Sequence, residues 1–190
     1  ELLNKSGYHI TFVDINKEVV NGLKCRDTYT IKILDENIEE IELNNFDALN
    51  IAEEKEELYK AIGEVELVTT SIGPNVLPII AKDIAEGLKL KVANNNTKLL
   101  DIIACENMIE GSDFLKQEIY KQLTAEEQKF VEACVGFPNS AVDRIVPAQK
   151  HDDVLLVEVE KFCEWVIEED KIKVEKNKNI FEPGKEALYR

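Results

Sequence analysis

Residues 65–75 read Val-Glu-Leu-Val-Thr-Thr-Ser-Ile-Gly-Pro-Asn, a pattern typical of a strand that ends in a tight turn. The β-branched run from Val65 to Ile72 predicts a central strand, which Gly73-Pro74-Asn75 ends. Apolar residues then recur at helical spacing from Leu77 to Leu88. With Asn75 as N-cap, Pro78 falls in the first helical turn, where its missing N–H has no intrahelical partner. The stretch therefore predicts a strand followed directly by a helix.

Strands and helices also alternate on both sides of this stretch. Upstream we expect a strand over 9–14, a helix over 17–24 with Asn16 as N-cap, a hairpin of strands over 29–34 and 39–43, and a helix over 51–62. Downstream we expect a strand over 99–105 buried on both faces, helices opened by Ser112 and by a capping box at Thr124, and short strands over 141–147 and 154–160. The charged segment 171–178 is predicted to be a loop or a boundary. This alternation favours an α/β fold of the doubly wound, Rossmann type, with a parallel sheet and extra β elements.

Composition limits the class of protein. The 190 residues are 44% hydrophobic, which is enough for one α/β core, so we expect a single Rossmann-type domain over 1–190. Thirty-eight acidic residues against 23 basic residues give a net charge of −15, which argues against nucleic acid or an anionic membrane as a partner. The acidic runs are typical of solvated helix faces.

The cysteines give no sign of a metal site. Cys25, Cys105, Cys134 and Cys163 are widely spaced, with no C-x-x-C pair and no His-rich segment near them, so zinc is not predicted. Reduced thiols in a cytoplasmic protein are the expected state. No apolar run approaches the roughly 20 residues that a membrane span needs, and no signal peptide is visible.

Ligands of open α/β sheets bind outside the carboxyl ends of the strands, and three of the predicted strand ends are polar or glycine-rich. Asp14 ends the strand over 9–14, where a carboxylate can accept the ribose hydroxyls of NAD and repel the 2′-phosphate of NADP. The alternative for Asp14 is a helix-capping or loop acid. Ser71, Gly73 and Pro74 can pass close to a cofactor because glycine lets backbone approach a ligand, and the alternative here is ordinary turn chemistry.

Asn107 and the pair Asp143-Arg144 are the remaining candidates. Asn107 carries both a donor and an acceptor, which suits a nicotinamide amide or a substrate oxygen. An amide that ties down a strand end is equally compatible with the sequence. Asp143 and Arg144 either form a structural ion pair or face a substrate cleft.

The sequence contains no glycine-rich phosphate loop. Its glycines stand at positions 7, 22, 63, 73, 87, 111, 136 and 184, so no two are separated by a single residue and no G-x-G-x-x-G occurs. Because the chain begins at Glu1 inside an amphipathic segment, we expect the first strand, this loop and the start of the first helix to precede it. A sheet without its first strand exposes an edge, so self-association of the chain is a further hypothesis.

Three segments resemble, in order and spacing, the amino-terminal domain of the mannitol-1-phosphate 5-dehydrogenases of the polyol-specific long-chain (mannitol) dehydrogenase family. They are Leu67–Pro74, Asp101–Met108 and Val135–Pro147. The resemblance runs from about Leu2 to about Trp165. Related mannitol 2-dehydrogenases and hexuronate reductases share the Asn after an acid and the Val-Asp-Arg-Ile element, whereas the run Ala104–Met108 favours the sugar-phosphate enzymes.

This resemblance implies hydride transfer between NAD and a polyol phosphate, interconverting mannitol 1-phosphate and fructose 6-phosphate without a metal. By motif, Asp14 resembles the ribose-binding acid, Gly73-Pro74 the cofactor loop, Asn107 a residue near nicotinamide and substrate, and Asp143-Arg144 an element near the active site. In this family the general base is a lysine of a helical carboxy-terminal domain, so we expect the chain by itself to be inactive. A hexuronate reductase, a mannitol 2-dehydrogenase and a non-catalytic nucleotide-binding module are the alternatives.

Overall fold

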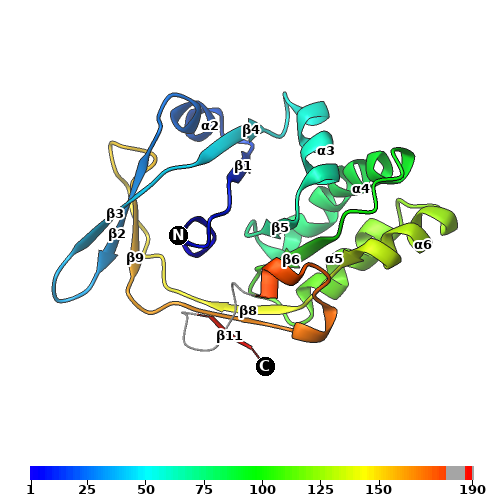
Figure 1. Cartoon of the computed structure of the whole chain (residues 1–190). Helices are drawn as coiled ribbons and strands as arrows, with labels where there is room; N and C mark the ends of the chain where they lie inside the picture. Colours follow the sequence, from blue (N-terminus) through cyan, green and yellow to red (C-terminus); the bar gives the residue numbers. More distant parts are fainter. Residues whose placement is uncertain (179–186, 190) are drawn as a thin grey trace. The chain divides into compact units, whose positions relative to one another are not determined.

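The computed structural model describes residues 1–178 and 187–189, and the chain divides into two compact units. Unit 1 consists of Glu1–Lys55 and Asp143–Cys163, and unit 2 consists of Glu56–Val142 and Glu164–Arg190. Each unit is therefore built from two separate stretches of the chain (Figure 1). The single domain expected over 1–190 stays a prediction. No helix in the described residues is long and apolar enough to cross a bilayer.

Unit 1 combines a pair of parallel strands with an antiparallel hairpin. Its elements are α1 (Leu2–Lys5), β1 (Ile10–Asp14), α2 (Lys17–Lys24), β2 (Tyr29–Leu34), β3 (Glu39–Leu43), β4 (Phe46–Asn50) and β9 (Val157–Glu160). β1 pairs in parallel with β4, whereas β2 pairs antiparallel with β3 and parallel with β9. Val20 of α2 packs with Leu155, and Ile31 of β2 packs with Leu43 and Val159.

The local signals of unit 1 were correct for the hairpin and for α2. Asn16 caps α2 by accepting a hydrogen bond from the Glu18 N–H at 3.0 Å. β4 was not predicted, because a short strand whose partner lies more than 30 residues away leaves no mark in the local pattern. The helix predicted over 51–62 begins later, at Lys55. Asn50 accounts for the delay, since its side chain accepts from the Ala52 N–H and turns the chain before the helix starts.

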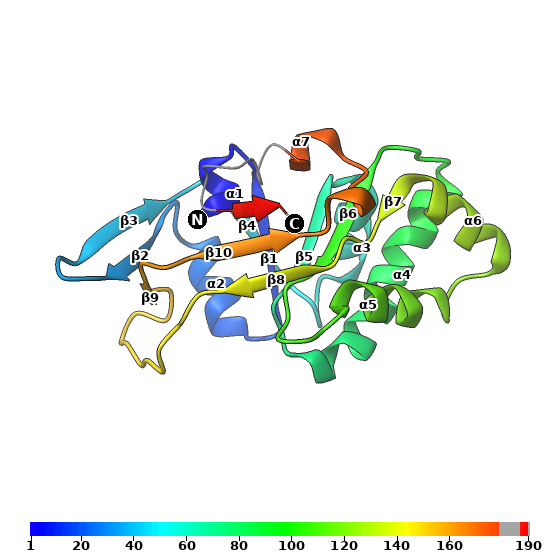
Figure 2. The ribbon, with the colours of Figure 1, turned by 90° about the horizontal axis from the view of Figure 1, so that it is seen from below.

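Unit 2 contains the larger parallel sheet. Its elements are α3 (Lys55–Glu64), which starts at the last residue of unit 1, β5 (Leu67–Thr70), η1 (Pro74–Val76), α4 (Leu77–Ala93), β6 (Leu100–Ala104), α5 (Gly111–Tyr120), α6 (Ala125–Cys134), β7 (Val135–Gly136), β8 (Ser140–Asp143), β10 (Glu164–Ile167), η2 (Glu169–Lys171), α7 (Glu175–Lys178) and β11 (Ala187–Tyr189). β5, β6 and β7 run parallel with β6 in the middle. A second sheet has β10 between β8 and β11 (Figure 2).

β6 is the centre of the core of unit 2. All five of its residues are buried, and Leu100 to Ile103 have no exposed surface, which confirms the prediction of a strand buried on both faces. α5 packs against both α4 and β6 (Figure 1). The sequence pattern of a nearly uninterrupted apolar strand therefore located the middle of the parallel sheet.

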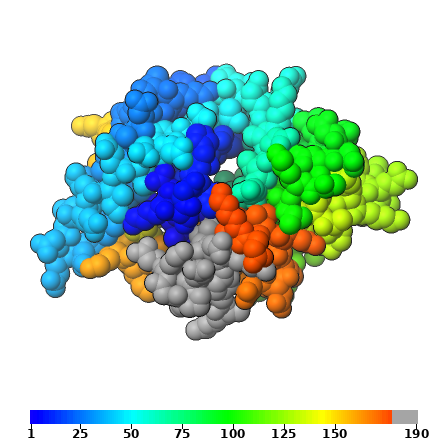
Figure 3. Space-filling model, viewed as in Figure 1, coloured from blue at the N-terminus to red at the C-terminus, as the bar shows by residue number. Residues whose placement is uncertain are grey.

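Asp101 is the polar exception within β6, and it anchors the segment that follows η2. Its carboxylate accepts hydrogen bonds from the Lys173 N–H at 2.8 Å, the Val174 N–H at 3.1 Å and the Asn177 side chain at 2.7 Å. Burial raises the pKa of Asp101 despite these donors. The prediction of a loop over 171–178 is correct for residues 172–174, which have no regular secondary structure, and wrong for residues 175–178, which form α7. Figure 3 shows the segment, in orange and red, on the surface of unit 2.

One of the three proposed helix starts in unit 2 is confirmed. Thr124 caps α6 in a capping box with Glu127, as the sequence predicted. Asn75 does not cap α4, because residues 74–76 form a 3-10 turn and the helix begins at Leu77, although Pro78 does lie in its first turn. Ser112 is the second residue of α5, and its hydroxyl accepts from the Ala104 N–H instead of capping the helix.

Candidate functional site

The loop after β5 is the first candidate for contact with a cofactor. β5 ends at Thr70, Ser71 and Ile72 are exposed, and Gly73 has φ +91° before Pro74 begins η1. A Cβ at Gly73 would meet no atom within 4 Å, so the positive φ, not crowding, favours glycine here. The predicted residues Ser71, Gly73 and Pro74 therefore form one turn at the carboxyl end of β5, with open space beside its glycine.

Glu106 holds this loop from the end of the neighbouring strand. Its Oε1 accepts hydrogen bonds from the Thr70 hydroxyl at 2.8 Å and from the Ile72 N–H at 3.0 Å. Its Oε2 accepts from the Gly73 N–H at 2.8 Å. Hydrogen bonds to a carboxylate are about twice as strong as those between neutral groups. The side chain therefore fixes the backbone of the turn that the sequence singled out.

Asn107 follows Glu106 and is exposed. In the described part of the chain the Asn107 amide makes no hydrogen bond. The structure therefore does not show the alternative role, in which this amide ties down the end of the strand. Because β5 and β6 are parallel neighbours, Asn107 lies at the same edge of the sheet as the 71–74 turn. The structure thus brings together four of the predicted cofactor residues, Ser71, Gly73, Pro74 and Asn107.

Cys105 lies between the strand and this pair of residues, and its thiol is unsuited to nucleophilic chemistry. Burial raises the pKa of the Cys105 thiol to about 12. A thiol with that pKa is protonated at neutral pH, and only the thiolate is strongly nucleophilic. The N–H of Cys105 donates to the Thr70 carbonyl at 2.9 Å, which keeps the ends of β5 and β6 together. Cys105 therefore has a packing role at this edge.

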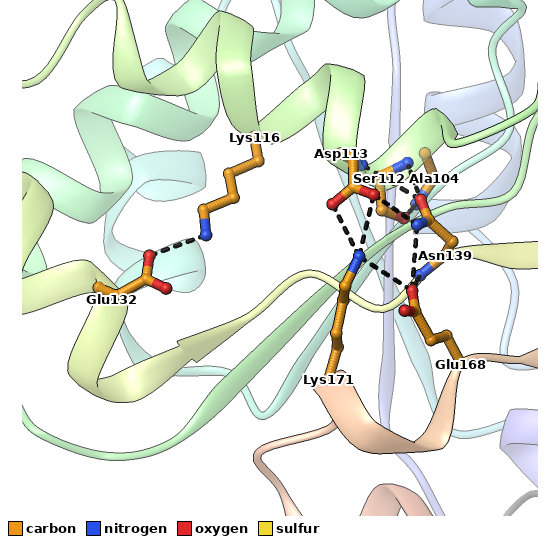
Figure 4. A network of polar contacts seen from close by, with 8 residues as sticks. All are labelled: Ala104, Ser112, Asp113, Lys116, Glu132, Asn139, Glu168 and Lys171. Atoms are coloured by element: carbon orange, nitrogen blue, oxygen red, sulfur yellow. Dashed lines mark hydrogen bonds and ion pairs between the residues drawn. The ribbon is translucent and has the colours of Figure 1, made fainter.

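A second polar network lies at the same end of β6 (Figure 4). The Oδ1 of Asn139 accepts from the N–H groups of Ser112 and Asp113, at 3.1 and 3.2 Å, and so caps the start of α5. Its Nδ2 donates to Asp113 at 2.7 Å and to Glu168 at 3.0 Å. Lys171 forms ion pairs with the same two carboxylates, at 2.9 and 3.0 Å. Asn139 thereby joins α5 to the residues around η2.

This network also fixes the last residue of β6. The Ala104 N–H donates to the Ser112 hydroxyl at 2.9 Å, and the Ser140 hydroxyl donates to the Ala104 carbonyl at 3.1 Å. Partial burial opposes ionisation of Asp113, but the hydrogen bonds from Asn139 and Lys171 outweigh it and lower the pKa of Asp113. The strand end that carries Glu106 and Asn107 is therefore held from two sides.

Asp14 belongs to unit 1, where it is the last residue of β1. Its side chain is exposed, and its Oδ1 accepts from the Asn16 N–H at 2.7 Å. This is the loop-acid role that the sequence left open, and it occupies only one of the two carboxylate oxygens. The ribose-binding role of Asp14 stays a prediction.

The boundary between the units falls within β8, so its last residue, Asp143, and the following Arg144 belong to unit 1. Arg144 pairs with Glu1 at 2.8 Å, and its Nε donates to the Glu160 carbonyl at 3.1 Å. No ion pair joins Arg144 to Asp143 in the described residues, so the first of the two alternatives for this pair does not hold. Asp143 is exposed.

Within the ranges that the structure describes, no group of three or more His, Cys, Asp or Glu side chains is placed to hold a metal ion. No disulfide joins any of the four cysteines.

Sequence reasoning missed two residues of this region, Glu106 and Asn139. Glu106 was recognised with Asn107 as a polar strand end but was given no role, although an acid that directly follows a fully buried strand is a signal for a site residue. Asn139 gave no usable signal, because its partners lie 26 to 29 residues away.

A parallel sheet covered by helices, with a glycine turn and a free amide at the ends of adjacent strands, defines a nucleotide-binding domain of the Rossmann type. The doubly wound fold class predicted from the sequence is confirmed. The chain belongs to the mannitol dehydrogenase Rossmann domain family, whose model matches residues 1–180.

Several curated relatives carry the same name. The mannitol-1-phosphate 5-dehydrogenase of Enterococcus faecalis is 51% identical over 169 residues, which are 89% of this chain and 44% of that protein. The enzyme of the same name from Lacticaseibacillus casei is 50% identical over 91% of this chain and 45% of its own length. That of Streptococcus pneumoniae is 46% identical, with 91% and 46% covered. The chain thus spans a little under half the length of these relatives.

Two solved structures share the fold at low sequence identity. A mannitol 2-dehydrogenase of Pseudomonas fluorescens, solved as a ternary complex with NAD and D-mannitol, superimposes with a TM-score of 0.74 at 16% identity, covering 94% of this chain and 45% of that one. A D-sorbitol dehydrogenase gives a TM-score of 0.78 at 17% identity, with 96% and 48% covered.

Proposed function

We propose that this chain is the cofactor-binding part of an NAD-dependent enzyme that interconverts mannitol 1-phosphate and fructose 6-phosphate. The observation that carries the proposal is the 46–51% identity to three mannitol-1-phosphate 5-dehydrogenases over about nine-tenths of the chain. These relatives are about twice as long as the chain, so the proposal concerns the complete protein that contains it. The predicted motifs 67–74, 101–108 and 135–147 all lie within the matched family domain.

The residues present fit NAD in two respects. Gly73 has open space beside its Cα, as a turn that lies against a ligand requires. Asp14 is an exposed acid at the carboxyl end of a parallel strand, and it retains one carboxylate oxygen for a ribose hydroxyl. We propose each as a cofactor-binding element within its own unit, Asp14 in unit 1 and the turn of Ser71, Gly73 and Pro74 in unit 2. When bound there, NAD would supply the hydride acceptor for oxidation of the polyol.

On the substrate side we assign supporting roles to Asn107, Asp143 and Arg144. The Asn107 amide can donate to the oxygen of the reacting carbinol or accept from the nicotinamide amide, because it has both groups and no partner among the described residues. The exposed Asp143 and the anchored Arg144 would contribute charge near the substrate. The general base of the reaction is assigned to a lysine outside this chain.

The phosphorylated polyol is preferred as substrate over the two alternatives. The relatives at 46–51% identity carry the sugar-phosphate name, whereas the mannitol 2-dehydrogenase shares only the fold at 16% identity. A mannitol 2-dehydrogenase or a hexuronate reductase remains an outcome that the experiment below distinguishes. The experiment also distinguishes the remaining alternative, a non-catalytic nucleotide-binding module.

The test is formation of NADH by the complete protein with NAD and mannitol 1-phosphate, beside unphosphorylated mannitol and a hexonate. Activity with the phosphorylated polyol alone supports the proposal. Asp143→Ala and Asn107→Ala should each lower kcat/KM by about 10²-fold or more, a size typical of groups that position or protonate a substrate. Activity only with mannitol or hexonate would reassign the substrate, and no activity with any of them would favour a non-catalytic module.

We also propose that the protein is cytoplasmic and that its partner is a small polyol phosphate. Four cysteines that form no disulfide suit a reducing compartment. The net charge of −15 opposes binding to nucleic acid or to an anionic membrane. Self-association of the chain stays a hypothesis, and light scattering that shows a single monomeric species would count against it.

A further inference from the structure

The Glu106 carboxylate accepts two backbone N–H groups and one hydroxyl from a single turn, all within 3.0 Å. We propose that Glu106 is a positioning residue for the dinucleotide: it sets the shape of the 71–74 turn and the place of Asn107, and thereby the affinity for the nicotinamide half of the cofactor. This inference rests on the proposed function, and it assigns a role that the family motif gave to neither Glu106 nor Thr70.

The first step of the argument concerns the donors of the turn. Two successive backbone N–H groups that point the same way commonly bind an anion such as phosphate. Here the N–H groups of Ile72 and Gly73 are already bonded to Glu106, which is itself an anion. The turn therefore cannot offer these donors to the pyrophosphate, and the nearby negative charge disfavours a phosphate. The part of the turn that is open to a cofactor is the space beside the Cα of Gly73, which suits a ribose or a nicotinamide ring.

The second step concerns stiffness. Glycine has the greatest backbone freedom of the residue types. A turn that contains Gly73 at φ +91° therefore needs a restraint from outside the turn to keep one conformation. Glu106 supplies that restraint from a strand end that is itself fixed, because Ala104 is bonded through both its N–H and its carbonyl to Ser112 and Ser140. A turn held in its bound shape loses less conformational entropy when the cofactor binds.

The third step links the turn to Asn107. Glu106 and Asn107 are adjacent, and the backbone before them is held by the Ala104 bonds and by the Cys105–Thr70 bond. If the carboxylate released the turn, Glu106 would be free to change rotamer while β6 stayed in place. The distance between Gly73 and Asn107 would then vary, and with it the fit of a ligand that contacts both.

The experiment compares variants of the complete protein. Glu106→Gln keeps the size of the side chain but removes the charge and replaces one acceptor oxygen by an amide that cannot accept an N–H. Thr70→Val removes only the hydroxyl donor, and Glu106→Asp keeps the charge on a shorter side chain. Glu86→Gln, on an exposed face of α4 where Glu86 pairs with Lys89, is the matched control.

We expect Glu106→Gln to raise both the Kd for NADH, measured by fluorescence titration, and the KM for NAD by about tenfold, the loss of roughly one hydrogen bond to a charged group. The value of kcat and the KM for the polyol should change less than about threefold, since the carboxylate touches the turn and not the reacting carbon. Thr70→Val should give a smaller rise, Glu106→Asp should recover part of the affinity, and Glu86→Gln should match the wild type.

A purely structural role would give a different result. In that case Glu106→Gln would lower the melting temperature and the fraction of active protein, and so kcat, while Kd and KM for the cofactor stayed at wild-type values; that result would overturn the inference. Failure of the proposed function is separable from it. A wild-type protein that ignores mannitol 1-phosphate but binds NADH about tenfold more tightly than Glu106→Gln would retain the positioning role and lose the substrate. A wild-type protein that binds no NADH would overturn both.

Discussion

Units 1 and 2 bury their apolar side chains to different depths. Among the described residues, the apolar side chains with no exposed surface, such as Leu88, Ile102 and Ile119, all belong to unit 2. The most buried apolar residues of unit 1, Val20 and Leu43, each retain 2% of their surface. The difference follows from the sheets, since β6 is central and covered by helices, whereas β2 and β3 form a hairpin with alternating exposure.

Both units carry ion pairs at their surface, but only unit 2 has a carboxylate with no exposed surface in the described residues, Asp101. Unit 1 carries ion pairs at its surface, among them Lys24–Glu54, Arg26–Asp153 and Lys161–Asp35. Pairs of this kind contribute about 0–1 kcal/mol each, and salt screens them. Unit 2 also carries surface pairs, such as Lys89–Glu86 and Lys98–Glu64, and in addition it places Asp101 inside the core and Asn139 at a helix start. The end of β6 is therefore held by partly buried hydrogen bonds as well as by the ion pairs of Lys171.

The largest effect on stability is expected from the same substitution, isoleucine to alanine, made once in each unit. Ile102→Ala in β6 removes a side chain with no exposed surface, and Ile33→Ala in β2 removes one that is 8% exposed. We expect the free energy of unfolding to fall by about 4 kcal/mol for Ile102→Ala and by about 2 kcal/mol for Ile33→Ala, because the tighter site leaves the larger cavity. Urea denaturation followed by circular dichroism measures both. Equal losses would mean that the two cores are packed alike.

A pair of glycine substitutions gives the next largest effect. A Cβ at Gly136 would lie 2.3 Å from Asp101 Oδ1 and 2.4 Å from the Lys171 carbonyl oxygen, so Gly136→Ala should destabilise the protein by about 2–3 kcal/mol. At Gly22 in α2 the nearest atom, Leu155 Cγ, is 3.4 Å from the added Cβ, and alanine favours a helix by about 0.5–1 kcal/mol. Gly22→Ala should therefore leave the melting temperature unchanged or raise it. A loss at Gly22 as large as that at Gly136 would contradict the difference in packing.

Replacing the buried Lys91 should stabilise the protein, by less than the truncations and Gly136→Ala destabilise it. This α4 lysine is 1% exposed, its ammonium donates to the Gly63 carbonyl at 3.3 Å, and burial lowers its pKa. Lys91→Met should raise the free energy of unfolding by about 1 kcal/mol, since a buried ammonium is costly and Asn96 still donates to Gly63 at 2.9 Å. Lys89→Met, at a partly exposed position of the same helix, serves as control. A decrease at Lys91 would show that its hydrogen bond outweighs the cost of burying its charge.

The smallest effects are pH dependences of opposite direction in the two units. Hydrogen bonds to Asn45 and Asp47 raise the pKa of His9 above 6.5, so its contribution is complete below that value and is lost as pH rises through the folded-state pKa. The pKa of Asp113 is lowered in the folded protein. Its contribution to the free energy of unfolding is therefore present above the ordinary carboxyl pKa of 3.8 and is lost as pH falls through the folded-state pKa. We would measure the denaturation midpoint as a function of pH. The change of the midpoint with pH should become smaller near neutrality in His9→Gln, and smaller near pH 4 in Asp113→Asn, than in the wild type. Unchanged profiles in both variants would argue against these two contacts.

The parts of the fold that the sequence could predict are those with local signals. The 65–72 strand, the turn at Gly73, the buried strand at 100–104 and the capping box at Thr124 each depend on residues within a few positions of one another. β4 and the anchoring of 173–177 could not be predicted, because both depend on partners more than 30 residues away. Ser112 illustrates the same limit, since Asn139 took over the cap that its type and place suggested.

The candidate site divides along the same line. Gly73 and Asn107 could be proposed because strand ends in an α/β sheet are recognisable one by one. Glu106 could not be assigned its role, because its three bonds exist only where the ends of β5 and β6 lie side by side, 33 to 36 residues apart in sequence. Asp14 was likewise proposed as an acid at a strand end, and Asp143 and Arg144 as an adjacent acid and base. The contacts of Asp14 and Arg144 lie within unit 1.

The bonds of Asp101 also set an order of events during synthesis. Its three donors follow it by 72 to 76 residues, so at about 5–20 residues per second the ribosome adds the last of them roughly 4–15 seconds later. Until then, a β6 strand that packed between its helices would hold a carboxyl group without partners. A nascent chain halted before Asn177 leaves the exit tunnel should therefore be cleaved by protease within unit 2, and one released after it should resist.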